Sequence, residues 1–405
     1  MLRDAEADAG VVTSAGYLAW AKTRASALAL MRGRLRSLSS GDRAALGIWA
    51  AAHLALFVLA WAAAWVFRAG TTHAPLTAAF QHWDADWLRN IAQYGYFGRG
   101  LSPDSEGFLP GYPLTLAATH LILRNWVLSE LVISAVAGCF AVVSLARLAN
   151  NSRAVLYLVT APAAIFLLVG YAETLFLALA VPAWLAARRG RWRRAALLAG
   201  LAALVRPDAL FLIAALAVMA LSGGRDTPSG PGSHVPWPDR WANAATACLA
   251  LAGPAAYVVY LRAATGSWLA WPHSQQAGWD LHLVTPAQAL RLTWWAAFRH
   301  PFAAGTAFEF QLELGAMAVM AAASLAFAVG RRWPEAVYSG LAVLALGTST
   351  WFQACPRTLL VLFPVWVALA RLDTKWPWIR YAYLGASAPL AAVVAMLYLA
   401  GQWAG

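Results

Sequence analysis

Acidic and aromatic residues gather at positions 82–96 of this 405-residue chain, in the stretch HWDADWLRNIAQYGY. Four of its residues recur at helical spacing, namely Trp83, Trp87, Ile91 and Tyr94. This spacing predicts an interfacial helix with an aromatic face in the membrane headgroup region. Side chains two positions apart on a helix point in different directions, so Asp84 and Asp86 are not expected to chelate a metal together. We expect the carboxylate of Asp84 to face a substrate; in the alternative, both aspartates only solvate an amphipathic helix.

Two arginines are candidates for binding phosphate. Arg206 precedes Pro207, and Arg357 follows Pro356, each at the end of an apolar stretch. Ionisable groups at membrane depth are costly and usually functional, and the planar guanidinium group fits phosphate oxygens. The alternatives are that the long side chains snorkel to the membrane surface, or that they form structural ion pairs, such as Arg206 with Asp208.

Glu173 follows Tyr171 by two positions. Its carboxylate could bind a sugar hydroxyl or merely cap the helix that follows. A metal site is not expected, because the histidines that accompany these motifs are scattered along the chain at His82, His273 and His282. The three cysteines show neither a CxxC pair nor metal-ligand spacing, so we predict no zinc site and no disulfide framework. We predict no cofactor, although Asp84 and Asp86 could still bind a metal if they lay outside a helix.

The elements that position these residues are membrane helices. Hydrophobic residues make up 61% of the chain and charged residues 12%, about half of the ~25% that is usual in soluble globular proteins. The stretch 44–67 runs for more than 20 positions with only His53 to interrupt it, which is long enough to cross a bilayer. The net charge of +12 does not indicate nucleic-acid binding, because basic residues cluster beside apolar stretches, as at 188–194. We therefore predict an all-α, polytopic integral membrane protein.

The charge clusters also predict a topology. Residues 1–43 are expected to be a cytoplasmic tail with an interfacial amphipathic helix around 15–37, followed by one transmembrane domain, 44–405. We predict about 10–11 membrane segments, near 44–67, 127–149, 154–170, 172–187, 195–222 (broken at 206–208), 241–262, 312–330, 335–350, 358–370 and 381–401. Residues 110–123 are too short to cross and are treated as re-entrant or interfacial. With the basic clusters inside, the first loop (68–126) and the polar motifs lie on the extracytoplasmic face of the cell membrane.

Blocks of sequence between about residues 80 and 370 occur in a characteristic order. They are HWDA at 82–85, IA at 91–92, GY at 95–96, FLPGYP at 108–113, PAAIFL at 162–167, GYAETLF at 170–176 and GLAALVRP at 200–207, with weaker echoes in QQAGW at 275–279, PR at 356–357 and FP at 363–364. In this order the blocks resemble the PIG-V family, the second mannosyltransferase of GPI-anchor synthesis, and its bacterial relatives.

The resemblance implies a glycosyltransferase with the GT-C type of helical fold and a polyprenyl phosphate mannose donor. In the expected reaction, Asp84 takes a proton from an acceptor hydroxyl, and the lipid phosphate leaves from the opposite face of the sugar, which inverts the configuration. The candidate substrate-binding residues are His82, Asp86, Tyr112, Tyr171, Glu173, Arg206, Gln275 and Arg357. Among them the arginines would stabilise the leaving phosphate. The expected partners are the lipid-linked donor, a glycan, glycolipid or protein acceptor, and membrane lipids.

Two other functions fit a multi-span chain. A secondary transporter is one, although transporters usually show repeated halves and polar groups near the bilayer midplane, and this sequence has no visible repeat. The other is a non-catalytic subunit that keeps the fold and partners another enzyme. Transfer of labelled sugar from a lipid phosphate donor separates both from a transferase.

Overall fold

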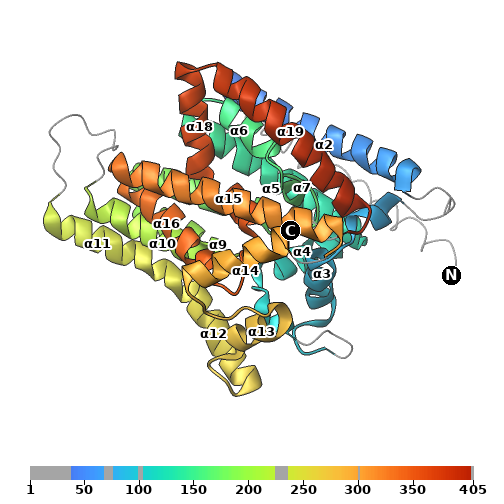
Figure 1. The fold of residues 1–405 in the computed structure, drawn as a ribbon. Helices are drawn as coiled ribbons and strands as arrows, with labels where there is room; N and C mark the ends of the chain where they lie inside the picture. The colour runs from blue at the N-terminus through green and yellow to red at the C-terminus, as the bar shows by residue number, and fades with distance from the viewer. Residues whose placement is uncertain (1–37, 68–75, 99–103, 224–235, 300–301, 403–405) are drawn as a thin grey trace, which may run out of the picture.

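The computed structural model describes residues 38–67, 76–98, 104–223, 236–299 and 302–402. Every regular element in these ranges is a helix, and the β contact described is an isolated bridge between Leu283 and Ser349. The all-α class is therefore confirmed (Figure 1). The amphipathic helix predicted at 15–37 lies outside the described residues.

Several helices are suited to a membrane. Five are long and apolar enough to cross one: α2 (Ser40–Phe67), α5 (Trp126–Ala149), the run of α11 (Trp237–Cys248), η3 (Leu249–Leu251) and α12 (Ala252–Thr265), α15 (Ala304–Val329) and α19 (Trp378–Leu399). The bent pair of α17 (Cys355–Val361) and α18 (Phe363–Lys375), which meet at 70°, would be a sixth. The first of these helices lies beside the last, α2 against α19 (Figure 1). The chain is a multi-pass membrane protein.

The predicted number of about 10–11 membrane segments is larger than the five or six that these length and composition criteria give over the described residues. The predicted span 154–170 is instead two short helices, α6 (Arg153–Val159) and α7 (Ile165–Leu168). Pro162 lies in the turn between them, and proline lacks the N–H donor that a continuing helix needs.

Other predicted segments are helices, but short ones. The block 195–222 is divided into α9 (Trp192–Ala203) and α10 (Ala209–Leu221), and the break between them, 204–208, includes the predicted break at 206–208. Two more have 16 and 15 residues, below the roughly 17 that a crossing needs: α8 (Glu173–Arg188) and α16 (Trp333–Gly347). They pack between the longer helices, α8 against α5 and α16 against α15.

The first loop carries two helices, α3 (Asp84–Tyr94) and α4 (Gly111–Leu123), that pack against each other. The 13 residues of α4 coincide with the segment predicted not to cross. The face of α3 that packs on the protein is formed by Ala85, Leu88 and Ile91. The predicted aromatic face is therefore wrong at Ile91, because burial selects a different stripe of the helix.

A close approach of two backbones fixes the first loop to the break between α9 and α10. The amide of Gly111 donates to the carbonyl oxygen of Leu204 at 2.7 Å. A Cβ atom at Gly111 would lie 2.7 Å from that same oxygen, so only glycine fits without a shift. The remaining short elements complete this end of the molecule: η1 (Leu76–Phe80), η2 (Ser105–Gly107), α13 (Ala270–Trp279) and α14 (Pro286–Phe298).

The contact of α2 with α5 provides a test of the packing. The ring of Trp49 lies over Gly138, where an added Cβ would be 2.0 Å from the ring carbon Cζ2, and its Nε1 donates to the carbonyl of Ala135 at 3.0 Å. We predict that Gly138→Ala lowers the free energy of unfolding by about 1–3 kcal/mol, because Trp49 must leave its position. Thermal unfolding of the purified protein in detergent measures this.

Gly47→Ala is the matched control. Gly47 lies on the same helix α2, and a Cβ there would meet nothing within 4 Å. Its stability should stay unchanged or rise slightly, since alanine favours a helix over glycine. An equal loss in both variants would contradict the packing seen here.

Candidate active site

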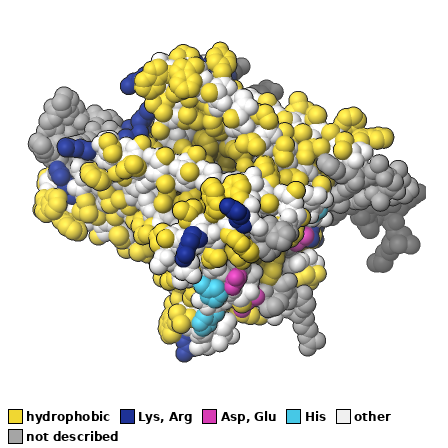
Figure 2. All heavy atoms as spheres, in the orientation of Figure 1, with side chains coloured by type: hydrophobic (Ala, Val, Ile, Leu, Met, Phe, Trp, Pro, Cys, Tyr) yellow, Lys and Arg dark blue, Asp and Glu magenta, His cyan; other side chains and the backbone are white. Residues whose placement is uncertain are grey.

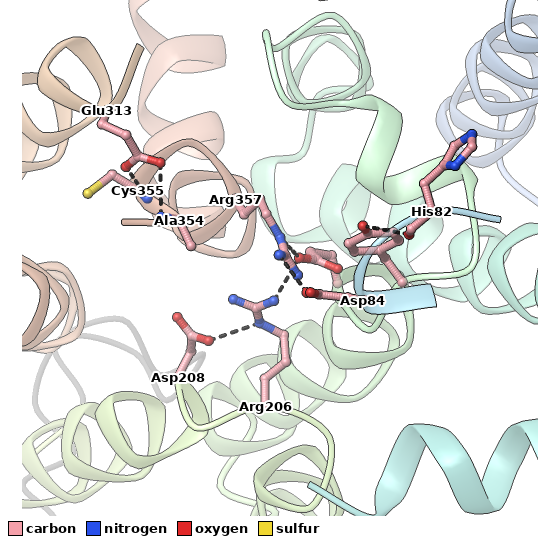
Figure 3. A network of polar contacts seen from close by, with 10 residues as sticks. His82, Asp84, Arg206, Asp208, Glu313, Ala354, Cys355 and Arg357 are labelled. Atoms are coloured by element: carbon pink, nitrogen blue, oxygen red, sulfur yellow. Dashed lines mark hydrogen bonds and ion pairs between the residues drawn. The ribbon is translucent and has the colours of Figure 1, made fainter. Parts of the chain in front are cut away.

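Five charged side chains from four places in the fold form one polar network (Figure 3). They are Asp84 at the start of α3, Glu173 at the start of α8, Arg206 and Asp208 between α9 and α10, and Arg357 in α17. Four contacts of 2.7–2.9 Å join them in the order Asp84, Arg357, Glu173, Arg206, Asp208. The two arginines predicted to bind phosphate and the predicted base therefore belong to the same cluster.

Asp84 reaches the cluster because of the turn that begins α3. Trp83, the residue before the helix, has a φ of 58°, in the left-handed region that non-glycine residues seldom adopt. The Asp84 carboxylate then accepts a hydrogen bond of 2.7 Å from Nη1 of Arg357 and is 14% exposed. Asp86 points elsewhere, pairs with Arg89 on the same helix and is 42% exposed. The two aspartates therefore have different partners, and whether they could bind a metal together stays a prediction.

Glu173 is the buried centre of the network. Its Oε1 accepts 2.7 Å hydrogen bonds from both Nη1 of Arg206 and Nε of Arg357, and its side chain is fully buried. A carboxylate in an apolar interior is costly unless charged donors pair with it, and here two guanidinium groups share its Oε1, while Oε2 has no hydrogen-bond partner among the described residues. Glu173 does not line the cavity described below, so its position favours organising the arginines over contacting a sugar directly.

Arg206 is held from both sides. Its Nε donates to Asp208 at 2.9 Å, so the structural pair considered from the sequence is present, and Nη1 donates to Glu173. Burial alone would lower the pKa of the Arg206 guanidinium, but the carboxylates of Asp208 and Glu173 outweigh it and raise the pKa above its usual value. Over the described residues, no hydrogen bond uses Nη2 of Arg206 or of Arg357. Each arginine thus keeps donors for a ligand.

Aromatic rings pack around Arg357. Its guanidinium carbon lies 4.8 Å from the ring centre of Tyr171 and 5.1 Å from that of Phe166, both cation–π contacts. The Tyr171 hydroxyl donates to the backbone carbonyl of His82 at 3.2 Å. Burial holds the pKa of the Tyr171 phenol well above its usual value, so it stays a donor. Tyr171 therefore links Arg357 to the chain just before Asp84.

The network forms one wall of a cavity of about 350 Å³. Its charged lining residues are Asp84, Arg206, Asp208 and Arg357; its amides are Gln275 and Gln353; its aromatic rings are Phe108, Phe211, Trp271 and Trp279. Gln275 Nε2 and Trp271 Nε1 both donate to the carbonyl oxygen of Gly107, at 2.9 and 3.2 Å. These bonds fix α13 to η2. The cavity therefore places charged donors, amides and aromatic rings around one space.

Four of the nine predicted site residues do not line this cavity and are not part of the ion-pair network: His82, Asp86, Tyr112 and Tyr171. Tyr112 is fully buried, and the ring of His82 packs edge-on against Tyr398. Sequence reasoning in turn did not select Trp271 and Gln353. Trp271, Gln275 and Trp279 recur every four positions, which is helical spacing. This spacing indicates that Trp271 lies on the same helix face as Gln275, which was predicted as a site residue.

A second, apolar space lies on the other side of α17. This groove, of about 650 Å³, runs between α15, α18 and α19. Pro356 and Leu359 of α17 face the groove, whereas Arg357 and Thr358 face the polar cavity. Hydrophobic side chains cover most of the molecular face drawn in Figure 2, across α15 and its neighbours. One short helix thus separates a charged compartment from an apolar one.

Comparisons with known proteins are sparse. No protein-family model matches the chain, and no curated protein matches it. Two solved structures do: the oligosaccharyltransferase of Archaeoglobus fulgidus in the apo form, at 12% identity, and the same enzyme tethered to an acceptor peptide with the NVT sequon, at 14%. Both have a TM-score of 0.37 and cover 87% of this chain, which spans about half the length of that enzyme (56% and 55%). At this level of similarity, function has to be inferred from the residues of the cavity themselves.

The centre of the network can be tested by removing one charge. We predict that Glu173→Gln lowers the free energy of unfolding by about 3–5 kcal/mol, because two buried guanidinium groups lose their shared carboxylate. Denaturation in detergent measures the change. Asp86→Asn is the control, since it breaks an exposed pair and should have little effect. A Glu173→Gln protein as stable as the Asp86→Asn protein would show that the network does not hold the fold.

Proposed function

We propose that this protein is an inverting membrane glycosyltransferase of the GT-C type that uses a lipid-phosphate-linked sugar as donor. The observation that carries the proposal is the position of Asp84, whose carboxylate lines a cavity together with Arg206 and Arg357. The apolar groove across α17 supports an amphiphilic donor, since a polar headgroup and a lipid chain need compartments of opposite character beside each other.

The proposed reaction is a single displacement. The acceptor hydroxyl oxygen attacks the anomeric carbon, its proton passes to Asp84, and the bond between the anomeric carbon and the phosphate oxygen breaks. The lipid phosphate leaves with the electron pair of that bond and needs positive charge more than it needs a proton. The product is a glycoside of inverted configuration, and the released lipid phosphate is the second product.

The ion pair between Asp84 and Arg357 requires that the donor binds before Asp84 can accept the proton. Without donor, the network holds three carboxylates and two guanidinium groups, and Asp84 is bonded to Arg357 at 2.7 Å. A donor phosphate competes with Asp84 for Arg357, because both are anions that guanidinium binds well. Donor binding thereby frees the Asp84 carboxylate to accept the proton. In this scheme the base becomes available only when the leaving group is in place.

The finer identity of the donor rests on the sequence resemblance. We infer mannose carried on polyprenyl phosphate from the blocks that resemble the PIG-V family, and we infer a reaction on the extracytoplasmic face from the basic clusters, which are expected to lie inside. The amides of Gln275 and Gln353 and the rings of Trp271 and Trp279 supply hydrogen bonds and an apolar face for a sugar. The acceptor is a hydroxyl of a glycan, a glycolipid or a protein.

The central test is transfer of labelled mannose from polyprenyl phosphate mannose by membranes that carry the protein. We predict that Asp84→Asn lowers the transfer rate by about 10²–10⁴-fold, since the general base is lost. Asp86→Asn, two residues away on the same helix, should keep the rate within about twofold, because exposed pairs contribute little. Unchanged transfer by Asp84→Asn would reject Asp84 as the base.

A second prediction concerns Arg357. Arg357→Ala should raise the KM for the lipid-linked donor more than the KM for the acceptor, because the guanidinium group binds the donor phosphate. Steady-state kinetics with each substrate varied in turn measures both values. An equal rise in both would count against a phosphate role.

A non-catalytic subunit remains the second candidate, and one observation favours it. Both arginines are already paired with carboxylates, which is also what a purely structural network would look like. In that case the Asp84→Asn and Arg357→Ala variants would have a lower free energy of unfolding than the wild type but the same rate of sugar transfer. A transporter would instead move a solute across the membrane without forming a glycosidic bond.

A further inference from the structure

Another buried carboxyl group, that of Glu313 in α15, contacts the start of α17. Its Oε1 accepts a hydrogen bond from the backbone amide of Ala354 at 2.9 Å, and its Oε2 accepts one from the amide of Cys355 at 2.8 Å (Figure 3). The residue is 6% exposed and belongs to α15, 41 residues earlier in the chain than Ala354. The contact therefore fixes one helix to the first turn of another.

The start of α17 needs this support. Ala354 has a φ of 58°, a left-handed conformation that costs energy in a residue other than glycine. Pro356 follows within the first turn and has no amide hydrogen to offer. The two amides that Glu313 accepts from would otherwise be buried helix-end donors without a partner, and the two oxygens of one carboxyl group satisfy both at once.

Arg357 is the next residue along this turn. Its guanidinium group binds Asp84 and Glu173, so the position of α17 sets where this group lies relative to α3 and α8. Glu313 lies outside the network of five charged residues and does not line the cavity. Its hydrogen bonds lead into the network through the backbone of α17.

We propose that Glu313 is a positioning residue. Its hydrogen bonds with the amides of Ala354 and Cys355 hold the start of α17 in the position from which Arg357 binds Asp84. This inference rests on the proposed function for its kinetic consequence, but its structural consequence does not. Loss of these two hydrogen bonds makes the start of α17 less stable. Because Arg357 binds Asp84, the start of α3 becomes less stable as well.

The same helix offers a matched control. Glu309 lies one turn before Glu313, is equally buried at 6% exposure, and its carboxylate has no hydrogen-bond partner among the described residues. Glu309→Gln thus changes a buried carboxyl group of α15 that makes no hydrogen bond to α17. Any effect of Glu313→Gln that Glu309→Gln lacks belongs to the contact with Ala354 and Cys355.

Hydrogen exchange of the purified full-length protein in detergent gives the structural readout. In Glu313→Gln, exchange of the backbone amides at 354–361 should become roughly tenfold faster. The glutamine side chain has an NH2 group in place of one carboxylate oxygen, so one of the two backbone N–H groups loses its acceptor. Exchange in α3, at 84–94, should also become faster, and Arg357→Ala should produce that change in α3 by itself. In the double variant Glu313→Gln with Arg357→Ala, exchange in α3 should be little faster than in Arg357→Ala alone, because both substitutions reach α3 through the contact of Arg357 with Asp84.

Kinetics gives the second readout. Glu313→Gln should raise the donor KM about tenfold, with a smaller change in the acceptor KM, whereas Glu309→Gln should change neither. Glu313→Asp keeps the carboxyl group on a shorter side chain, so its donor KM should lie between those of the wild type and Glu313→Gln. It serves as the test variant if Glu313→Gln does not fold.

The outcomes are distinct. Faster exchange at 354–361 that leaves 84–94 unchanged would overturn the positioning role, and so would equal effects of Glu313→Gln and Glu309→Gln. If the wild type transfers no sugar, the proposed function fails, but the exchange experiment still decides whether Glu313 positions Arg357.

Discussion

The burial of Glu173 between two arginines is the interaction on which the rest of the site depends. A lone carboxylate inside a bundle of apolar helices would be strongly unfavourable, and so would either guanidinium group. Together they are stable only if α8, α17 and the break between α9 and α10 meet at one point. Asp84 and Asp208 complete the set from the outer ends. The charges thus specify an arrangement that apolar packing alone would leave open.

The helices around this point show how such an arrangement is reached. Short helices and breaks, in place of uniform spans, bring polar residues to the end of an apolar segment. Arg206 lies in the break before α10, and Arg357 lies in a seven-residue helix that a 70° bend separates from α18. Pro207 lies in the break beside Arg206, whereas Pro356 lies in the first turn of α17, where a proline is tolerated because its missing N–H would have no partner within the helix.

Much of this could be predicted from the sequence, and the limits have physical reasons. Hydropathy predicted the helical class, and the polar motifs named the five residues of the network, with Asp208 considered only as a partner of Arg206. Hydropathy could not separate a span from two short apolar helices, as at 154–170, because both have the same composition. It also could not show that Ile91 faces the protein, nor that Glu313 would meet amides 41 residues away, since neither local spacing nor composition encodes such a contact.

The thin wall made by α17 has a consequence for shape. A helix with its side chains is only about 10 Å wide, so the two compartments on either side of it are close, yet no straight path joins them through the helix. A molecule that fills both has to curve around α17. A flexible phosphate ester between head and tail can make that curve, whereas a rigid fused-ring amphiphile of the same polarity cannot. Selection between lipids would then depend on the flexibility of the linkage between headgroup and tail as much as on the chemistry of either end.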